Sequence, residues 1–182
     1  LKLSSDVKPD YMAVAFDLKA PTFRHKMYKE YKGTRKPMPE ELREQVPLLK
    51  EVLHLMNITT FEQEGIEADD IIGTIAKHAD TKTYIVTGDK DSFQLVDDRV
   101  SVMYTKRGIS NIEEYNAENF TSLTGLTPPQ IIDYKALAGD DSDNIPGIKG
   151  IGAKTAITLL QKYGDLDNIY AHTDELSLSV QN

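Results

Sequence analysis

The chain has 182 residues, of which 40% are hydrophobic, and a formal net charge of −8 at pH 7. These values predict a globular domain with a sizeable core and room for a small appended subdomain. The absence of cysteine excludes disulfide bonds and thiolate metal sites and suits a reducing cytosol, and no apolar run is long enough to span a membrane.

The first predicted element is a buried strand of a parallel sheet, an apolar run over residues 11–16 that ends at Asp17. A basic segment follows over residues 22–36, with six cations against one acid. A run of this kind is usually a solvated helix face. Interleaved aromatic rings also fit nucleic acid, because bases stack on rings while cations hold phosphates. The cations are Arg24, Lys26, Lys29, Lys32, Arg35 and Lys36, and the rings are Phe23, Tyr28 and Tyr31.

Apolar spacing then predicts two helices, over residues 39–57 and 69–79. We expect Pro47 to kink or divide the first helix. Its apolar face is formed by Leu42, Val46, Leu49, Leu53 and Met56, and the second helix is expected to bury Ile71, Ile72, Ile75 and Ala76. Two further buried strands, at residues 83–87 and 100–104, complete an alternation that predicts an α/β fold with a mostly parallel sheet.

The last third of the chain reads as helical. Helices are predicted over residues 130–138 and 153–163, on either side of a glycine-punctuated hairpin. We therefore predict two parts: an α/β core over residues 1–115, which includes the basic helical segment 22–57, and a helical subdomain over residues 116–182.

Carboxylates recur at four ends of predicted elements: Asp17; Glu67, Asp69 and Asp70; Asp89 and Asp91; and Asp140, Asp141 and Asp143. If residues 89–91 are extended, Asp89 and Asp91 share a side. Each group alone could be a helix cap or a polar turn. Their recurrence at the edge where α/β active sites lie favours a metal centre. Oxygen ligands suit Mg²⁺ or Mn²⁺ rather than zinc, and the four histidines show no ligand spacing.

The hairpin places Gly147, Gly150 and Gly152 in the order Gly-x-x-Gly-x-Gly, which is neither the dinucleotide fingerprint nor a Walker loop. Glycines let the backbone approach a ligand closely, and the N–H groups of the helix that follows can face a phosphate. An acidic cluster beside such a hairpin suggests an enzyme that cuts or transfers phosphodiesters.

Four segments together resemble one known family: Phe16-Asp17 with Phe23-Arg24-His25, Glu67-Ala68-Asp69-Asp70, Thr87-Gly88-Asp89-Lys90-Asp91, and Gly139 to Gly152. They are similar to the 5′ nuclease (flap endonuclease) family and, within it, to the 5′→3′ exonuclease domains of bacterial DNA polymerase I. The resemblance covers nearly the whole chain in order. It implies a PIN-like nuclease core and a helix–hairpin–helix subdomain that binds DNA.

The resemblance also implies roles for individual residues. Asp17, Asp69 and Asp140 would be catalytic together with Arg24 and Lys32. One Mg²⁺ would bind Asp17, Glu67, Asp69 and Asp70, and a second would bind Asp89, Asp91, Asp140 and Asp143. DNA would contact Phe23, Arg24, Tyr28, Lys32, Arg35, Gly147, Lys149, Gly150, Gly152 and Lys154, with K⁺ on the hairpin carbonyls.

The implied activity is metal-dependent cleavage of 5′ flaps, nicked DNA and RNA primers on DNA, by a monomer in the bacterial cytoplasm at the nucleoid, with or without an attached polymerase. The resemblance further implies a strand before residue 11 with another metal-binding aspartate, and residues 1–10 do not carry that pattern.

Two rival interpretations belong to other classes. A haloacid dehalogenase-type phosphatase is suggested by Thr87-Gly88-Asp89, but Phe16-Asp17-Leu18-Lys19 lacks the second aspartate that this chemistry needs. A non-catalytic DNA-binding module would keep the basic segment and the hairpin without turnover. A flap-cleavage assay with and without Mg²⁺ separates the three.

Overall fold

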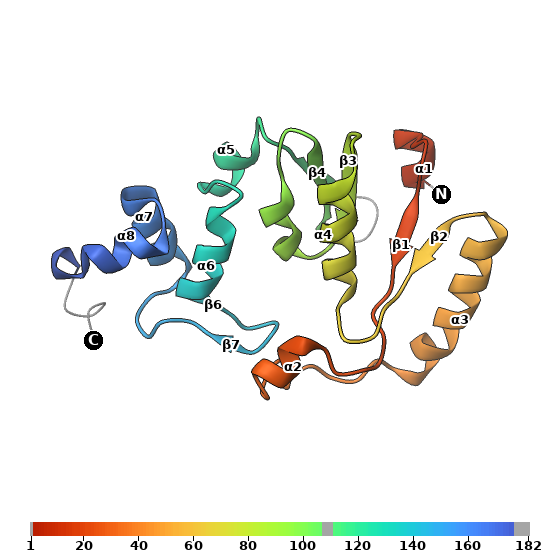
Figure 1. Cartoon of the computed structure of the whole chain (residues 1–182), viewed down its shortest axis with the longest axis horizontal. Helices are drawn as coiled ribbons and strands as arrows, with labels where there is room; N and C mark the ends of the chain where they lie inside the picture. The colour runs from red at the N-terminus through yellow and green to blue at the C-terminus, as the bar shows by residue number, and fades with distance from the viewer. Residues whose placement is uncertain (1, 107–110, 177–182) are drawn as a thin grey trace. The chain divides into compact units, whose positions relative to one another are not determined.

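The computed structural model describes residues 2–106 and 111–176 (Figure 1). The chain divides into two compact units. The first comprises Leu1–Lys29 and Arg35–Ile72, and the second comprises Glu30–Thr34 and Gly73–Asn182. Five residues of the basic segment therefore belong to the second unit, although their neighbours in sequence belong to the first.

The first unit is built on a short parallel strand pair. Strand β1 (Ala13–Ala15) pairs with β2 (Thr59–Phe61) so that Ala13 lies opposite Thr59. The unit also holds α1 (Lys2–Val7), α2 (Phe23–Met27), α3 (Glu40–Leu55) and the first turn of α4 (Ala68–His78). Strand β2 follows α3 directly and was not predicted, because three residues are too few to show a period.

Helix α3 confirms the predicted helix and runs through Pro47 without division. Its predicted apolar face is less covered than the pattern indicates. Val46 and Leu53 are half-buried, whereas Leu42 and Leu49 are each 48% exposed. No residue of α3, which lies wholly in the described part of the chain, is buried.

The second unit contains a three-stranded sheet in the order β3-β4-β5. Strands β3 (Thr83–Thr87) and β4 (Val100–Thr105) are parallel, as predicted, whereas β5 (Ile112–Tyr115) runs antiparallel to β4. Strand β5 escaped prediction because Glu113 and Glu114 at its centre make the segment read as a polar loop. The sheet is therefore mixed at its β5 edge.

Two details of the sequence analysis were wrong. Residues 89–91 are not extended, because Asp89 caps a 3-10 helix, η1 (Lys90–Leu95), by accepting from the Asp91 N–H. A cap formed by an aspartate side chain competes locally with continued strand geometry.

The second wrong detail concerns helix α4, which buries fewer apolar residues than expected: Ala76 is buried, but Ile75 is 38% exposed.

An aromatic cluster fixes η1 against the sheet. Phe93 is 4% exposed, and its ring lies tilted against that of Tyr115, with 4.3 Å between the ring centroids. Its ring also meets Phe120 edge-on at 5.6 Å. Such contacts add to the apolar area they bury. Since Phe93 lies two residues after Asp91, burial of this ring fixes the position of that carboxylate.

The helices of the second unit form the predicted helix–hairpin–helix. Helix α5 (Phe120–Thr124) precedes α6 (Gln130–Ala138), the hairpin strands β6 (Gly139–Asp140) and β7 (Ile145–Pro146), and then α7 (Ala153–Tyr163). Helix α8 (Leu166–Ala171) and a 3-10 turn, η2 (Thr173–Glu175), follow (Figure 1). Helix α6 packs on α7, and each helix has a fully buried leucine, Leu137 on α6 and Leu160 on α7.

Asp97 ties the end of α4 to the start of β4. Its carboxylate accepts from the N–H groups of Arg99 and Val100 and from Lys77 Nζ at 2.7 Å. The Lys77 bond first, and the two backbone bonds, lower the pKa of Asp97 to about 2. Because the pKa of Asp97 is lower in the folded than in the unfolded chain, where it is about 3.9, the ionised carboxylate stabilises the fold at pH values above about 3.9. This stabilisation is lost as the pH falls to about 2.

We expect Asp97→Asn to lower the free energy of unfolding by about 1 kcal/mol at pH 7, a small effect because both partners are more than a third exposed. Urea unfolding should show this difference shrinking between pH 4 and pH 2. The same change at exposed Asp98 is the control. A pH-independent difference would show that the charge of Asp97 contributes nothing.

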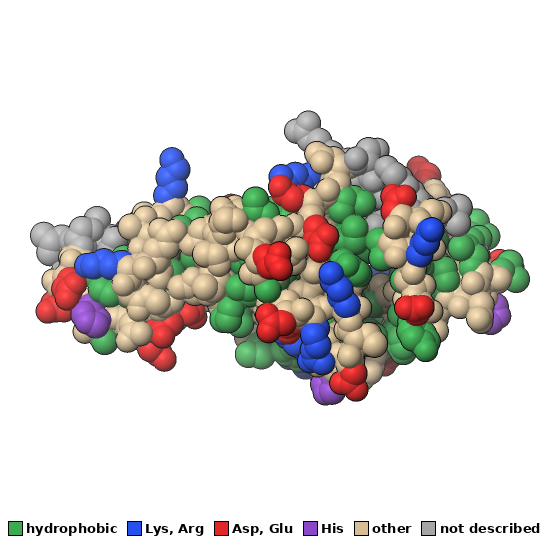
Figure 2. All heavy atoms as spheres, turned by 90° about the horizontal axis from the view of Figure 1, so that it is seen from above, with side chains coloured by type: hydrophobic (Ala, Val, Ile, Leu, Met, Phe, Trp, Pro, Cys, Tyr) green, Lys and Arg blue, Asp and Glu red, His purple; other side chains and the backbone are tan. Residues whose placement is uncertain are grey.

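Side chains of both charges lie at the surface (Figure 2). Figure 2 shows lysine and arginine side chains lying among aspartates and glutamates on one face, with hydrophobic side chains beside them. Among the described residues, no helix combines the length and the apolar character that crossing a membrane would require.

Candidate metal centre and nucleic-acid interface

Three carboxylates of the second unit converge on one point. Asp91 is held by η1, Asp140 by the end of β6, and Asp143 by the hairpin loop. Each offers an oxygen, and these oxygens lie within 4.8 Å of one another. That spread is close to the roughly 4 Å between ligands on opposite sides of a Mg²⁺ ion. We call Asp91, Asp140 and Asp143 the carboxylate cluster.

Lys135 on α6 places its ammonium group among these carboxylates. It forms an ion pair and a hydrogen bond with Asp140 Oδ2 and lies 2.5 Å from Asp91 Oδ1. Asp91 Oδ1 is buried, and its cationic neighbour is this ammonium. A group of carboxylate oxygens that already attracts a half-buried cation has the ligand chemistry that a divalent ion uses.

The cluster shifts the pKa values of its members in opposite directions. Burial raises the pKa of Asp91, an effect that Lys135 opposes and the charges of Asp89 and Asp140 reinforce. Burial also acts to raise the pKa of Asp140, but hydrogen bonds from Lys135 and Ser142 outweigh it and lower the value to about 2. Asp140 is therefore ionised at neutral pH and available as a ligand.

We expect Lys135→Met to increase affinity for Mn²⁺ about tenfold in the absence of DNA. Removing the ammonium leaves the carboxylates without a competing cation, so a metal ion gains more by neutralising them. Isothermal titration calorimetry would measure the change. Lys77→Met, which removes a paired lysine elsewhere in this unit, is the control. Equal or weaker Mn²⁺ binding by Lys135→Met would show that the ammonium assists metal binding.

Asp89, which was predicted to join the second metal site, is instead bonded to its own helix. Its Oδ1 accepts from the Asp91 N–H at 2.9 Å, and its backbone N–H bonds Thr87 Oγ1. It contributes to the carboxylate cluster by holding Asp91, and a direct role in metal binding stays a prediction.

The predicted first-site acids gather at the start of α4 in the first unit. Asp17 Oδ1 accepts from the Ala68 N–H at 2.8 Å, and Asp70 Oδ2 accepts from the Glu67 N–H at 2.9 Å. These bonds satisfy donors that the first turn of a helix leaves free. Asp69, in the same turn, is half-buried.

Arg24 on α2 completes this acidic group. Its guanidinium grips Asp70 with two hydrogen bonds of 2.8 Å each, and lies 3.9 Å from Glu67 Oε2. Glu67 is 7% exposed and is approached by Thr22 Oγ1. A bidentate arginine–carboxylate pair fixes both side chains. The predicted contact of Arg24 with phosphate stays a prediction.

The other predicted DNA contacts vary in exposure. Phe23 is 43% exposed with Arg24 stacked on its ring at 4.5 Å, and Tyr28 is 37% exposed. Lys32 is half-buried and lies over the Tyr31 ring. Arg35, Lys149 and Lys154 are exposed.

The three hairpin glycines differ in whether the structure requires glycine at that position. A Cβ on Gly147 would lie 2.4 Å from the carbonyl carbon of Ala138 and 2.5 Å from the Gly139 nitrogen, so this glycine is required by packing. Gly150 has φ +88°, which disfavours other residues. Gly152 precedes α7 and would have open space around a Cβ. Packing therefore requires Gly147, whereas contact of Gly150 and Gly152 with a ligand stays a prediction.

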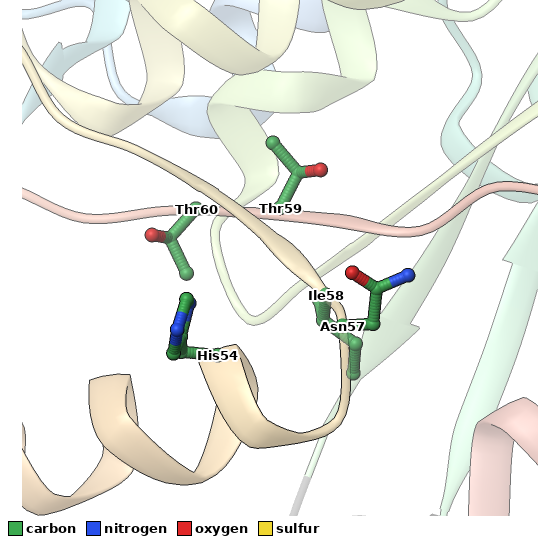
Figure 3. A pocket seen from close by; sticks show the side chains of 5 residues that line it. All are labelled: His54, Asn57, Ile58, Thr59 and Thr60. Carbon is green, nitrogen blue, oxygen red and sulfur yellow. The ribbon is translucent and has the colours of Figure 1, made fainter.

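A small polar pocket of about 190 Å³ lies in the first unit, where α3 ends and β2 begins. Figure 3 shows its lining side chains, which are His54, Asn57, Ile58, Thr59 and Thr60. No sequence motif pointed to these residues, and the pocket contains none of the predicted site residues.

Comparison with known proteins identifies the class to which this fold and site belong. Residues 1–125 match the family described as "5′-3′ exonuclease, N-terminal resolvase-like domain", and residues 126–182 match "5′-3′ exonuclease, C-terminal SAM fold". The chain therefore belongs to the 5′-3′ exonuclease family.

Its relatives include both fused and shorter proteins. It is 47% identical to DNA polymerase I of Bacillus caldotenax over 178 residues, covering 96% of this chain and 20% of that protein. It is also 47% identical over 176 residues to the "5′-3′ exonuclease" of Mycoplasma pneumoniae, covering 94% and 60% respectively. The chain thus spans about a fifth of the polymerase relatives and three fifths of the Mycoplasma protein.

Solved structures of nucleases are similar to this chain in fold. The phage T5 5′-exonuclease with bound zinc superposes with a TM-score of 0.75 at 28% identity, over 96% of this chain and 67% of that one. The T5 D15 flap endonuclease in complex with DNA and metal ions gives 0.76 at 28% identity, over 97% and 68%. The Rad2 catalytic core, at 22% identity and a TM-score of 0.59 over 90% of this chain and 50% of that one, shares the fold.

Sequence reasoning missed two residues that act at the acidic hairpin, one packed against it and one within it. Lys135, which pairs with Asp140, lies five positions before it on a helix predicted for its apolar residues. Asn144, in the hairpin loop, bonds the Glu30 carbonyl 114 positions away. Neither carries a local signal, because each acts through its tertiary partner.

Proposed function

We propose that the chain is a metal-dependent 5′ nuclease that hydrolyses phosphodiesters at the 5′ ends of branched DNA and of RNA primers. The observation that carries the proposal is the carboxylate cluster beside the helix–hairpin–helix, in a chain of the 5′-3′ exonuclease family. In the cell the activity would serve replication and repair at the bacterial nucleoid, either attached to a polymerase or alone.

In this proposal Asp91, Asp140 and Asp143 hold a divalent cation, Mg²⁺ or Mn²⁺, with Asp89 beside them. Asp17, Glu67, Asp69 and Asp70 hold the second ion. When bound, such ions activate water and offset charge on the phosphate in the transition state. The chain would supply carboxylate oxygens as ligands and hold them in position through caps and the aromatic cluster, and it would need no serine or histidine nucleophile.

The substrate would be held by backbone and by cations. Duplex phosphates would bind to the hairpin from Gly147 to Gly152 and to the N–H groups at the start of α7. Exposed Lys149 and Lys154 would add positive charge, and the hairpin carbonyls would hold a K⁺ ion. Phe23, Arg24, Tyr28, Lys32 and Arg35 would guide the 5′ single strand. Contacts of these kinds recognise structure rather than sequence.

The test is cleavage of a 5′-labelled flap by the whole chain in Mg²⁺ and in EDTA, resolved on a denaturing gel. Metal-dependent release of short 5′ products, at least a hundredfold faster than from a blunt duplex, supports the proposal. Flap binding without cleavage would identify a DNA-binding module instead. Hydrolysis of a small phosphomonoester without flap cleavage would favour the phosphatase alternative.

A further inference from the structure

The turn Glu30–Thr34, which lies inside the basic segment, is docked in the second unit. The Gly33 N–H closes the turn on the Glu30 carbonyl at 2.9 Å, and Tyr31 between them is 6% exposed. Lys32 at the tip of the turn has φ +55°, a left-handed backbone conformation that residues other than glycine rarely adopt. A strained residue beside a buried ring indicates a turn held by its surroundings.

Two reciprocal hydrogen bonds hold this turn against the acidic hairpin loop. The Lys32 N–H donates to the Asp143 carbonyl at 2.9 Å, and Asn144 Nδ2 donates to the Glu30 carbonyl at 2.8 Å. Asn144 is itself left-handed, with φ +57°. Each segment thus donates once and accepts once, and each uses a left-handed residue to do so. We call this pair of bonds the clip.

Asp143 takes part in both the clip and the carboxylate cluster. Its side chain is one of the three converging carboxylates, while its carbonyl holds the Lys32 N–H. The next residue, Asn144, supplies the second bond of the clip. The cluster and the turn are therefore linked through a single residue, Asp143.

We propose that Asn144 is a positioning residue that couples cation binding at the carboxylate cluster to the order of the turn Glu30–Thr34, and so fixes Lys32 for the 5′ strand. The inference rests on the proposed function for the identity of the ion and the strand. Coupling of this kind is reciprocal, so a strand bound at Lys32 also tightens cation binding.

The first experiment measures amide hydrogen exchange at Lys32 and Gly33 by NMR during a Mg²⁺ titration. In the wild-type protein we expect Mg²⁺ to slow exchange at Lys32 about fivefold to tenfold, the effect of strengthening one hydrogen bond. Asn144→Gly removes the amide donor and relaxes the left-handed backbone. It should abolish this response while Mg²⁺ still binds the carboxylates.

Asn57→Gly is the matched control, because Asn57 has the same φ of +57° in the first unit and lies outside the clip. It should respond to Mg²⁺ like the wild type. Asn144→Asp is a second variant that keeps the size of the side chain and tolerates the left-handed backbone but cannot donate. It too should lose the response. If both Asn144 variants respond like Asn57→Gly, the clip does not couple the two segments.

A second measurement separates this inference from the proposed function. Fluorescence anisotropy measures the affinity for a 5′-phosphorylated single strand with and without Ca²⁺. We expect Ca²⁺ to raise this affinity in the wild-type protein, and the factor by which it does so should be at least threefold smaller in Asn144→Gly. Exchange coupling in a protein that cleaves no flap would uphold the clip and refute the nuclease proposal. Flap cleavage by the wild-type protein, together with an unchanged Mg²⁺ response in Asn144→Gly, would uphold the nuclease proposal and refute the clip.

Discussion

Replacing Asp140 with asparagine is expected to slow flap cleavage about a thousandfold at saturating Mg²⁺. The change removes an ionised carboxylate, the proposed metal ligand, whose pKa lies at about 2, and with it roughly 4 kcal/mol of metal-assisted stabilisation of the transition state. The fold should persist, because the amide oxygen can still accept from Ser142 and Lys135 keeps its ion pair with Asp91. Single-turnover cleavage of a labelled flap, with circular dichroism, measures both effects.

Asp141→Asn is the matched control, since Asp141 is exposed, adjacent in sequence and outside the carboxylate cluster. It loses the same charge and should cleave within about twofold of the wild type, as surface substitutions usually do little. Near-normal cleavage by Asp140→Asn would mean that the carboxylate cluster is not the metal centre. An equal loss in both variants would assign the effect to general charge instead.

Gly147→Ala is expected to destabilise the second unit by about 3 kcal/mol. Its Cβ would meet the Ala138 carbonyl and the Gly139 nitrogen at 2.4–2.5 Å, and these are backbone atoms that cannot rotate away. Gly139 is the C-cap of α6 with φ +79°, so moving its nitrogen would disturb the end of this helix. Displacing this turn would also move Asp140, so metal affinity should fall with stability.

Gly152→Ala serves as the comparison for Gly147→Ala, because nothing lies within 4 Å of the Cβ it would add. It should unfold in urea at nearly the wild-type midpoint. Its duplex affinity should nevertheless fall, if the hairpin backbone approaches phosphate at this position. A midpoint for Gly147→Ala equal to that of Gly152→Ala would show that the hairpin relaxes around a side chain.

The strands and helices with strong local patterns could be predicted from sequence. The ends of β3, α6 and α7 agree with prediction, because apolar runs and helical periods are properties of neighbouring residues. The acidic hairpin could be predicted for the same reason, since Asp140, Asp143 and the glycines all lie within thirteen positions. Strands β2 and β5 could not, because one is three residues long and the other carries two glutamates.

The sequence by itself determined the types of side chain that this protein has for its chemistry: clustered carboxylates, a glycine-punctuated hairpin, a basic segment and no thiols. Tertiary structure decided which carboxylates meet, because Asp91 reaches Asp140 through the burial of Phe93 and the packing of α6 against η1. It also decided that Lys135 lies among them and that Asn144 holds Glu30. Contacts between residues far apart in sequence depend on how elements pack, and packing leaves no period in the chain.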